Sequence, residues 1–394
     1  AESRADWISF LACGTRLAPE ALLCIGDYLA LHPDWRLIYS DEDTLAADGT
    51  GEAPQFKPDF NLELLRATDY LGGVFVERAA LCAAGGYARC PGGETYDLAL
   101  RLVDHAGEAA IGHIPEVLQR RPVSARTSAE DDAARQALAA HFARRGIDAE
   151  ILPGLIDGQS RRPVYRHTTR PLVSIIVPTR NRLDLLAPCV ESLFANTAYP
   201  NWELIIVDNG NPEPATTHYF AELRAAQPQR VRIMAQPGDF DFARLNNHAA
   251  ELAHGDYLLL LNDDTQCIHD DWLDALLAHA QRPEVGIVGA RLLFPDSLKV
   301  QHAGVVLGMS GSAGHVFSNL DHDAPAYLGR AQLDQEYSAV TGACLLIRRQ
   351  LYRELDGLDG ATFKISYNDI DLCLKVRQRG LKIIYTPHAT LLHH

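Results

Sequence analysis

The chain has 394 residues, 47% hydrophobic and 22% charged, which are ordinary proportions for a globular protein of two or three domains. Its formal net charge of −15 at pH 7 argues against nucleic acid as the main partner, because binding phosphates requires clustered Lys and Arg. No apolar stretch approaches the roughly 20 residues of a membrane span, and the eight scattered cysteines form no CxxC pair, so we expect a cytoplasmic protein with reduced thiols.

The first part of the chain opens on a strand-like apolar run at residues 5–12, which predicts that the sequence starts inside its first domain. Helices are predicted at 19–31, 62–70, 78–84 and 96–105, with a strand at 36–40. The acidic stretch from Ile38 to Asp43 is interpreted as a solvated loop, with sugar or metal binding as the alternative. A further helix begins near Ser128, its predicted N-cap, and ends at Gly146.

From Leu172 onward, apolar strands alternate regularly with helices. Strands are predicted at 172–178, 202–208, 231–234, 257–262 and 285–289, with helices at 183–195, 215–226, 242–253 and 272–282. This alternation predicts parallel βαβ units with right-handed crossovers. A mixed region follows, with helices at 349–355 and 369–379 and a strand at 382–385. We therefore predict an α/β fold with a mostly parallel sheet and an irregular C-terminal portion that completes a pocket.

Polar side chains gather where these predicted strands end. They are Thr179 and Asn181 after the first strand, Asp208 and Asn209 after the second, and Asn262, Asp263 and Asp264 after the fourth. Because the carboxyl ends of parallel strands meet at one edge of a sheet, we expect these groups to lie together. Adjacent carboxylates at a diphosphate site need a bridging cation, and Mg²⁺ or Mn²⁺ suits oxygen ligands. The alternative is a solvated turn in which Asp263 or Asp264 caps the following helix.

A second acidic cluster, Asn368 to Asp371, stands at the start of a predicted helix. Residues two apart on a helix point in nearly opposite directions, so only one of Asp369 and Asp371 can face a pocket. The alternative is that both carboxylates cap the helix and interact with its dipole. The sequence has no GxxxxGK[ST] loop and no GxGxxG after a strand, so P-loop hydrolysis and dinucleotide redox chemistry lose support.

Residues 172–394 resemble the family 2 glycosyltransferases of the GT-A fold, the kind found in bacterial surface-polysaccharide assembly. The matching stretches, in family order, are LVSIIVPTRNRLDLL, WELIIVDNGN, FARLNNHAAELAHGDYLLLLNDDT, VQHAGVVLG, SAVTGACLLIRR and YNDIDLCLKVRQRG. The resemblance implies an inverting transfer of a sugar, of the hexosyltransferase type, from a nucleotide-diphosphate donor to a hydroxyl of a glycan or lipid-linked acceptor. It also implies a place in O-antigen-like biosynthesis, with rhamnose as a candidate sugar by analogy and peripheral membrane contact left open.

The resemblance assigns roles to individual residues. Asp369 matches the family's catalytic base, and Asp264 matches the main ligand of its Asp-x-Asp metal motif, whose first position is Asn262 here. The expected nucleotide-sugar-binding residues are Thr179, Asn181, Asp208, Asn209, Asn246, Asp263 and Gly342. His393 and His394 are considered as a further metal ligand, with His394 as the candidate, because a neutral imidazole suits such a cation. The alternative is a histidine at a frayed strand end with no ligand role. His302 is expected to line the pocket as a hydrogen-bonding group.

Residues 1–121 resemble a truncated copy of the same fold that has lost both chemical sites. ISFLACGTRLAPEAL is similar to the segment around the metal motif, with Ala12, Gly14 and Thr15 where acidic residues are expected. ETYDLALRL is similar to the base-bearing helix, with Thr95 in the base position. We thus predict an inactive domain at 1–121, a helical linker at 122–170 and a catalytic domain at 171–394. The rival functions are a non-catalytic module that binds carbohydrate or a nucleotide sugar, and a nucleotidyltransferase.

Overall fold

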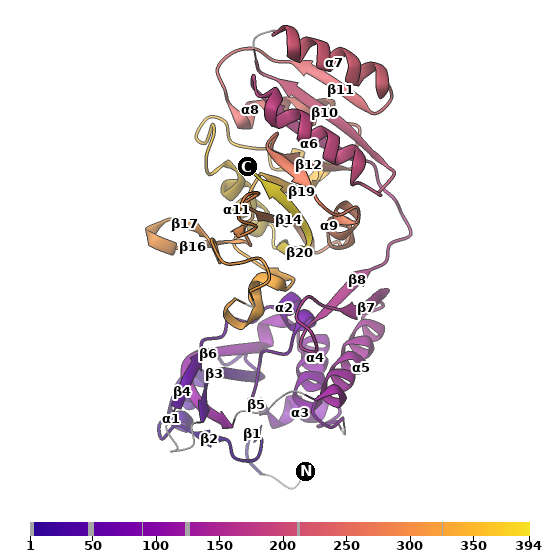
Figure 1. Ribbon diagram of the computed structural model, residues 1–394. Helices are drawn as coiled ribbons and strands as arrows, with labels where there is room; N and C mark the ends of the chain where they lie inside the picture. Colours follow the sequence, from indigo (N-terminus) through magenta and orange to yellow (C-terminus); the bar gives the residue numbers. More distant parts are fainter. Residues whose placement is uncertain (1–3, 46–50, 89, 123–126, 211–212, 325) are drawn as a thin grey trace. The chain divides into compact units, whose positions relative to one another are not determined.

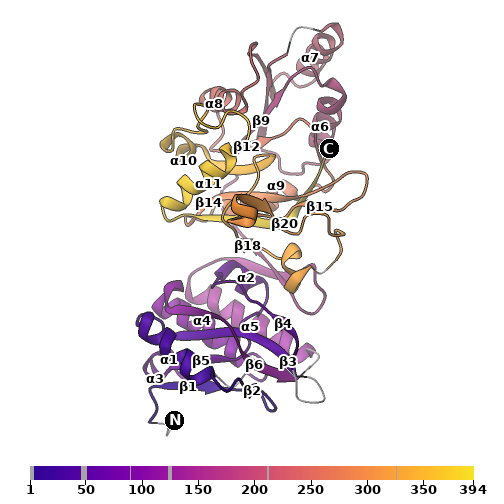
Figure 2. The same cartoon turned by 90° about the vertical axis from the view of Figure 1, so that its left-hand side faces the viewer.

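The computed structural model describes residues 4–45, 51–88, 90–122, 127–210, 213–324 and 326–394. The chain divides into two compact units, Ala1–Tyr165 and Arg166–His394, called the first and the second unit below. Each contains a mixed sheet with helices packed on it (Figures 1 and 2), so the predicted α/β class is confirmed. No helix in the described ranges is both long and apolar enough to cross a membrane.

The sheet of the second unit has the strand order β11-β10-β9-β12-β19-β14-β20-β13. Its first four strands are parallel, as predicted: β11 (Val231–Ala235), β10 (Trp202–Asp208), β9 (Val173–Thr179) and β12 (Tyr257–Leu261). The others are β19 (Cys344–Arg348), β14 (Val285–Leu293), β20 (Lys382–His393) and β13 (Thr265–Cys267). The antiparallel strand β19 lies between β12 and β14. The alternation of strands and helices did not predict this insertion, because β19 comes from a segment that follows the alternating elements.

Helices cover both faces of this sheet (Figures 1 and 2). Their bounds are α6 (Leu183–Ala195), α7 (Pro214–Ala226), α8 (Phe242–Leu252), α9 (Trp272–Ala280), α10 (Arg349–Glu354) and α11 (Asn368–Gln378). Successive strand residues point to opposite faces, so Ile175 packs in a core with α6, α7 and α9, while Ile176 packs in one with α8, α10 and α11. Short elements complete the unit: β15 (Val300–His302), β16 (Val305–Leu307), β17 (Ala313–His315) and β18 (Gln335–Glu336).

The first unit contains a smaller sheet with the order β1-β5-β3-β6-β2. Its strands are β1 (Trp7–Phe10), β2 (Arg16–Leu17), β3 (Leu37–Leu45), β5 (Val74–Glu77) and β6 (Ile111–Pro122), and β4 (Gly51–Gln55) pairs with β3. Its helices are α1 (Ala21–Leu31), α2 (Leu62–Ala67), α3 (Arg78–Ala83), α4 (Glu94–Ala106) and α5 (Ser128–Arg144), and β7 (Ala149–Pro153) forms a hairpin with β8 (Arg161–Tyr165). The sequence predicted all five helices but not β5 or β6.

The first unit repeats the strand arrangement of the later half of the second. The order β1-β5-β3-β6-β2 has the same sequence of antiparallel, antiparallel, parallel and antiparallel pairings as β12-β19-β14-β20-β13. The pair Trp7↔Glu77 occupies the position of Tyr257↔Arg348. Ala12 follows Trp7 by five residues, as Asn262 follows Tyr257.

The strand β1 of the first unit differs from β12 of the second unit in its pairing. In the second unit β12 pairs on both sides, with β9 and β19. Among the described strands of the first unit, β1 pairs with β5 alone. Helix α1 is apolar on its outer side as well as its inner side, with Leu22, Leu23 and Leu31 exposed by 69%, 71% and 72%. No described strand of the first unit corresponds to β9, β10 or β11.

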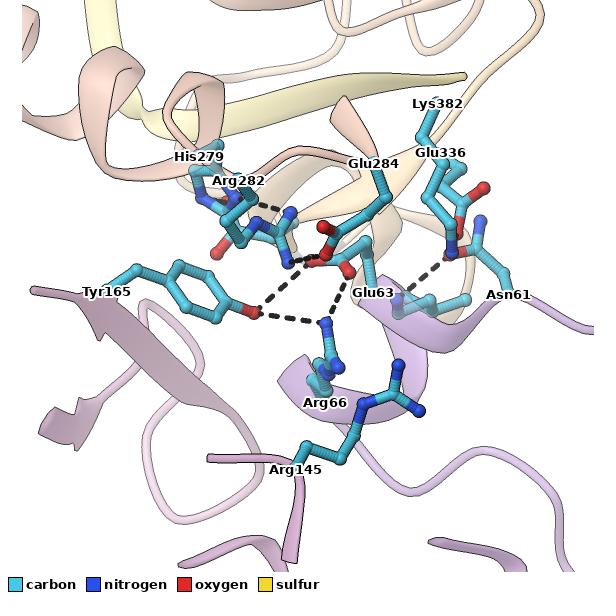
Figure 3. A network of polar contacts seen from close by, with 12 residues as sticks. Asn61, Glu63, Arg66, Arg145, Tyr165, His279, Arg282, Glu284, Glu336 and Lys382 are labelled. Atoms are coloured by element: carbon cyan, nitrogen blue, oxygen red, sulfur yellow. Dashed lines mark hydrogen bonds and ion pairs between the residues drawn. The ribbon is translucent and has the colours of Figure 1, made fainter. Parts of the chain in front are cut away.

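The segment predicted as a linker packs inside the first unit, so the structural boundary falls at 165 rather than near 121 and 170. Figure 3 shows Glu63 between Arg66 and Tyr165: Glu63 Oε1 lies 2.7 Å from Arg66 Nη1, and the Tyr165 hydroxyl donates to Glu63 Oε2 at 3.4 Å. Helix α5 begins with a capping box in which Thr127, not the predicted Ser128, is the N-cap. Glu63 of α2 and Tyr165 of β8 are far apart in the sequence, so local composition does not reveal their contact.

The acidic stretch Ile38–Asp43 is not a solvated loop, because it lies within β3. Asp41 is 2% exposed, accepts a hydrogen bond from the Lys57 backbone at 2.8 Å and contacts His113 Nε2 at 2.9 Å. Glu42 pairs with the Lys57 ammonium at 3.0 Å. Asp41 and Glu42 can be buried because His113 and Lys57 bind their carboxylates. These partners come from distant segments, so the local sequence pattern does not reveal them.

Candidate active site

A cavity of about 400 Å³ opens in the second unit where β9 and β12 end. Its size suits a small-molecule ligand. Five residues predicted from the sequence line it, namely Thr179, Asn262, Asp263, Gly342 and Asp369. The clusters after β9 and β12 therefore meet at one edge, together with the start of α11. The other predicted residues, Asn181, Asp208, Asn209, Asn246, Asp264 and His394, are not among those that line this cavity.

Asp369 is fixed at the cavity by backbone donors. Its Oδ2 accepts a hydrogen bond from the Gly342 N–H at 2.9 Å, and its Oδ1 accepts one from the Ile370 N–H at 2.9 Å. Asp371 instead forms an ion pair with Lys375 at 2.7 Å, one turn further along α11. The helix thus separates the two carboxylates as the two-residue spacing predicted, and Asp369 is the one at the cavity.

Asp263 carries an electrostatic cost at the cavity. Burial raises the pKa of its carboxyl, and the neighbouring charge of Asp264 adds to the rise, while the Thr179 hydroxyl and Arg182 oppose it. Two carboxylates that share a partly dry site repel each other, and a cation bound between or beside them removes that repulsion. The donor set therefore fits a hard divalent ion.

Of the two C-terminal histidines, His393 is the one whose side chain contacts Asp264. Its Nε2 lies 3.0 Å from Asp264 Oδ1 and 3.1 Å from Asn262 Nδ2. The predicted ligand was His394, whose backbone N–H donates to the Asp264 carbonyl at 3.0 Å and whose side chain is exposed. Neighbouring residues of a strand end point to opposite sides, so only one of the two imidazoles can face Asp264. In this structure the imidazole of His393, and not that of His394, lies beside Asp264.

Three of the residues predicted to hold the nucleotide lie outside the cavity lining and form local hydrogen bonds. Asp208 Oδ1 accepts from the Gly210 N–H at 2.9 Å, which orders the turn after β10. Asn209 donates to the Gln236 carbonyl at 2.7 Å and ties that turn to the end of β11. Asn246 is fully buried in α8 and donates to the Phe242 carbonyl at 2.9 Å, so its direct role is in the packing of that helix.

Further side chains line the cavity that the sequence did not single out, namely Arg180, Arg182, Phe240 and Phe242. Arg180 and Arg182 directly follow β9, and the run TRNR was the available signal for them. The two aromatic rings flank the N-terminus of α8. Cations and aromatic faces of this kind suit a phosphate-bearing ligand with planar or ring-shaped groups.

His302 lies behind the cavity rather than in its lining. It is 1% exposed, and its Nδ1 is 2.9 Å from Nδ1 of His315. Burial lowers the pKa of His302 well below its usual range, and the nearby His315 and His393 act in the same direction. His302 is thus a buried hydrogen-bonding group, but it does not line the cavity as the sequence had predicted.

Comparison with known proteins supports the glycosyltransferase reading. Residues 174–356 match the sequence profile described as "Glycosyl transferase family 2". All of this chain aligns with "Uncharacterized protein y4gI" of Sinorhizobium fredii at 39% identity and with "O-antigen biosynthesis protein RfbC" of Myxococcus xanthus at 38% identity. The alignments cover 44% and 31% of those proteins, so the chain spans less than half the length of these curated relatives.

A solved structure is similar at low identity. The mannosyltransferase PcManGT from Pyrobaculum calidifontis, in complex with GDP-Man and Mn²⁺, aligns at 17% identity with a TM-score of 0.43, covering 62% of this chain and 60% of that one. The family assignment rests on the sequence matches and on the α/β architecture described above. Through residues 174–356, this chain belongs to glycosyl transferase family 2.

Proposed function

We propose that the second unit is a metal-dependent, inverting glycosyltransferase that moves a sugar from a nucleotide-diphosphate donor to a hydroxyl of a glycan or lipid-linked acceptor. The observation that carries this proposal is the meeting of two kinds of carboxylate at one cavity. Asp369 enters it from α11, and Asp263 lies beside it after β12. A base and a place for the leaving diphosphate are thereby combined in one site.

Asp369 acts as the general base. The acceptor hydroxyl gives its proton to a carboxylate oxygen of Asp369 while its own oxygen forms the bond to the anomeric carbon. The bond from that carbon to the diphosphate oxygen breaks at the same time, and the nucleoside diphosphate leaves with the electron pair. The N–H groups of Gly342 and Ile370 hold the carboxylate in a fixed orientation during this transfer. Attack from the face opposite the leaving group inverts the anomeric configuration.

Asp264, His393 and Asn262 would hold the divalent cation. They offer a carboxylate oxygen, an imidazole nitrogen and an amide oxygen, a set that fits Mn²⁺ better than Mg²⁺ because Mg²⁺ prefers oxygen ligands alone. The cation, when bound, neutralises the charge that develops on the departing diphosphate. Because Asn262 replaces a carboxylate, Asp264 carries most of the negative charge that attracts it.

The nucleotide lies along the carboxyl ends of β9 and β10 in this proposal. Thr179 and Asp208 end those strands side by side, since they are paired in register. Asp208 and Asn209 hold the base and ribose, and Asn181 borders the same turn, because a Cβ at Gly210 would come within 2.0 Å of Asn181 Oδ1. Arg180 and Arg182 at the cavity offer positive charge to the phosphates.

We propose that the first unit is a truncated and inactive copy of the same fold, with a role in packing or acceptor handling. Its strand order supports this, and so does the chemistry at the equivalent site. Thr95, the second residue of α4, stands where α11 has Asp369, and its hydroxyl lies 3.0 Å from the Tyr87 hydroxyl. The Tyr87 ring stacks on Phe10 at 3.8 Å between centroids. A neutral threonine hydroxyl is far too weak a base to take a proton from an acceptor hydroxyl, so Thr95 cannot replace Asp369 as a general base.

The name of the Myxococcus relative supports a role in bacterial O-antigen-like polysaccharide biosynthesis for this chain. The experiment that tests the proposal incubates the full chain with Mn²⁺ and nucleotide sugars of each common base, and measures the release of nucleoside diphosphate and free sugar. A ligand present at about 100 times its Kd should add about 2.7 kcal/mol of stability, so a thermal-shift screen identifies the donor first. Stabilisation without any turnover, even with glycan acceptors, would instead support a binding module. Release of pyrophosphate would support a nucleotidyltransferase.

A further inference from the structure

His393, on β20, is held by a side chain of β15, a strand that pairs with β14. Gln301 Nε2 donates to the backbone carbonyl of His393 at 3.2 Å. A backbone carbonyl can only accept, so this contact fixes which end of the Gln301 amide is the NH₂ group. The oxygen end, Oε1, then faces Nδ1 of His393 and accepts its hydrogen bond. The amide orientation therefore determines that Nδ1 of the imidazole carries the proton.

With Nδ1 turned to Gln301, the other ring nitrogen faces Asn262 and Asp264. A neutral imidazole that is protonated at Nδ1 presents Nε2 as its one acceptor. That atom lies 3.1 Å from Asn262 Nδ2 and 3.0 Å from the Asp264 carboxylate oxygen. This Asp264 oxygen is buried and has no hydrogen-bond donor among the described residues. A cation that displaces the Asn262 N–H from Nε2 could therefore bind the nitrogen and the carboxylate oxygen together.

Both residues belong to paired strands, which limits their movement. His393 pairs with Thr265 between β20 and β13, directly after the acidic turn. The residue after Gln301 pairs with Leu292 of β14. The side chain of Gln301 therefore approaches His393 from a fixed backbone, on the side of the ring away from Asp264.

We propose that Gln301 is a positioning residue for the metal: it holds His393 in the Nδ1-protonated tautomer, so that Nε2 and Asp264 bind one divalent cation together. This inference deepens the proposed function and rests on it, because it adds a group that acts through a metal ligand. Hydrogen bonds from outside the ligand shell orient a metal-bound histidine and raise its basicity, and their loss typically lowers metal affinity about 10–100-fold. The loss of metal affinity should be large here because Asn262 contributes no negative charge to the site.

The test is the affinity of the full chain for Mn²⁺ alone, measured by the loss of the free-ion signal in electron paramagnetic resonance. Gln301→Leu removes the acceptor for Nδ1–H and should weaken Mn²⁺ binding about 10–100-fold. Gln301→Glu keeps an acceptor but loses the donor to the His393 carbonyl, and should bind Mn²⁺ within a few-fold of wild type. Gln350→Leu is the matched control, since Gln350 is an exposed residue of α10 whose side chain bonds to Glu354.

Three results would decide the matter. Equal Mn²⁺ affinity in Gln301→Leu and wild type overturns the inference, and so does an equal loss in the Leu and Glu variants, because a structural role of the amide donor predicts that pattern. Absence of Mn²⁺ binding in the wild type contradicts the metal part of the proposed function itself. If Gln301→Leu does not fold, the nitrogen NMR shifts of His393 in the metal-free wild type decide instead. Protonation at Nδ1 is expected, and protonation at Nε2 overturns the inference.

Discussion

The backbone N–H of Gly342 donates to Oδ2 of Asp369 across 2.9 Å, and so links the loop before β19 to the first turn of α11. A Cβ at Gly342 would stand 3.4 Å from Cβ of Asp369 and 3.7 Å from the Phe242 ring. The glycine therefore brings its amide close to the carboxylate and leaves the adjoining space open. The expected effect of substituting Asp369 depends on this hydrogen bond.

Replacing Asp369 with Asn should abolish most of the turnover and leave the fold intact. The amide oxygen can still accept from Gly342, so the melting temperature should change little. Loss of a general base typically lowers the rate about 10²–10⁴-fold, while donor affinity should stay near that of wild type because the donor contacts lie on other strands. The comparison variant is Asp371→Asn, which removes only a partly exposed pair with Lys375 and should cost under about 1 kcal/mol. If Asp371→Asn loses turnover at an unchanged melting temperature and Asp369→Asn does not, the base is misassigned.

Replacing Asp264 with Asn should remove the dependence of nucleotide binding on Mn²⁺, because it deletes the one carboxylate that faces His393. Asp263→Asn should have a milder effect. Its pKa is raised by burial and by the charge of Asp264, so the neutral amide relieves repulsion as well as removing charge. Calorimetry of nucleoside diphosphate binding with and without Mn²⁺ measures both. An Asp264→Asn protein with wild-type Mn²⁺ dependence contradicts the proposed ligand set.

Removing residues 1–165 should leave a folded protein that still hydrolyses the donor, because residues 166–394 form a compact unit with its own sheet and cores. Removing only residues 1–121 should give a less soluble protein. That cut separates α5 from the rest of its unit and exposes Leu138 and Phe142, which are 0% and 3% exposed in the intact chain. Circular dichroism and donor hydrolysis test both truncations. A folded 166–394 protein without nucleotide binding would show that the first unit takes part in the site.

Replacing Glu203 with Gln should lower the free energy of unfolding by about 1.5–3 kcal/mol at neutral pH, as expected for hydrogen bonds to a charged group. Burial alone would raise the pKa of Glu203. Its carboxylate accepts hydrogen bonds from the Ser174 hydroxyl at 2.6 Å and the His254 N–H at 2.8 Å, and it pairs with Arg232 at 2.9 Å. These contacts outweigh burial, so the pKa of Glu203 is lowered.

A carboxyl with a lowered folded-state pKa stabilises the protein above its unfolded-state pKa, which is about 4.3 for Glu. The difference in unfolding free energy between wild type and Glu203→Gln should therefore shrink as the pH falls below that value. Urea unfolding at several pH values measures it, with Glu191→Gln on exposed α6 as the control. A difference that grows toward acid pH contradicts the assignment.

The parallel half of the second unit was predictable because its information is local. The apolar runs from Val173 to Thr179 and from Trp202 to Asp208 end in turn residues and are followed by amphipathic helices, so strand limits and direction follow from short windows of sequence. The polar residues at their ends could be placed at one sheet edge for the same reason. The cavity position of Asp369, by contrast, rested on the family resemblance and helix geometry together.

What the sequence could not supply were contacts between distant segments. Gln301 and His393 are 92 residues apart, and nothing in either neighbourhood marks the pair. Asp41 looked solvated because its partner His113 lies 72 residues away on another strand. Similarly, β19 enters the sheet antiparallel from a segment beyond the βα alternation. In each case the chemistry of the residue was visible but its partner was not.

The outer side of β1 and α1 has a consequence for the behaviour of the purified chain. Among the described strands of the first unit, β1 leaves one edge unpaired, which offers a row of N–H and C=O groups to any other extended chain. The exposed leucines of α1, on the same unit, add hydrophobic attraction. We expect the protein to associate in a concentration-dependent and reversible way, with sedimentation coefficients that rise with loading. Lysine at positions 22 and 23 should suppress this by adding charge and removing apolar surface, whereas lysine at exposed Leu252 of α8, in the second unit, should not. We therefore expect the free edge of β1 and the exposed leucines of α1 to affect the colloidal stability of the protein rather than its catalysis.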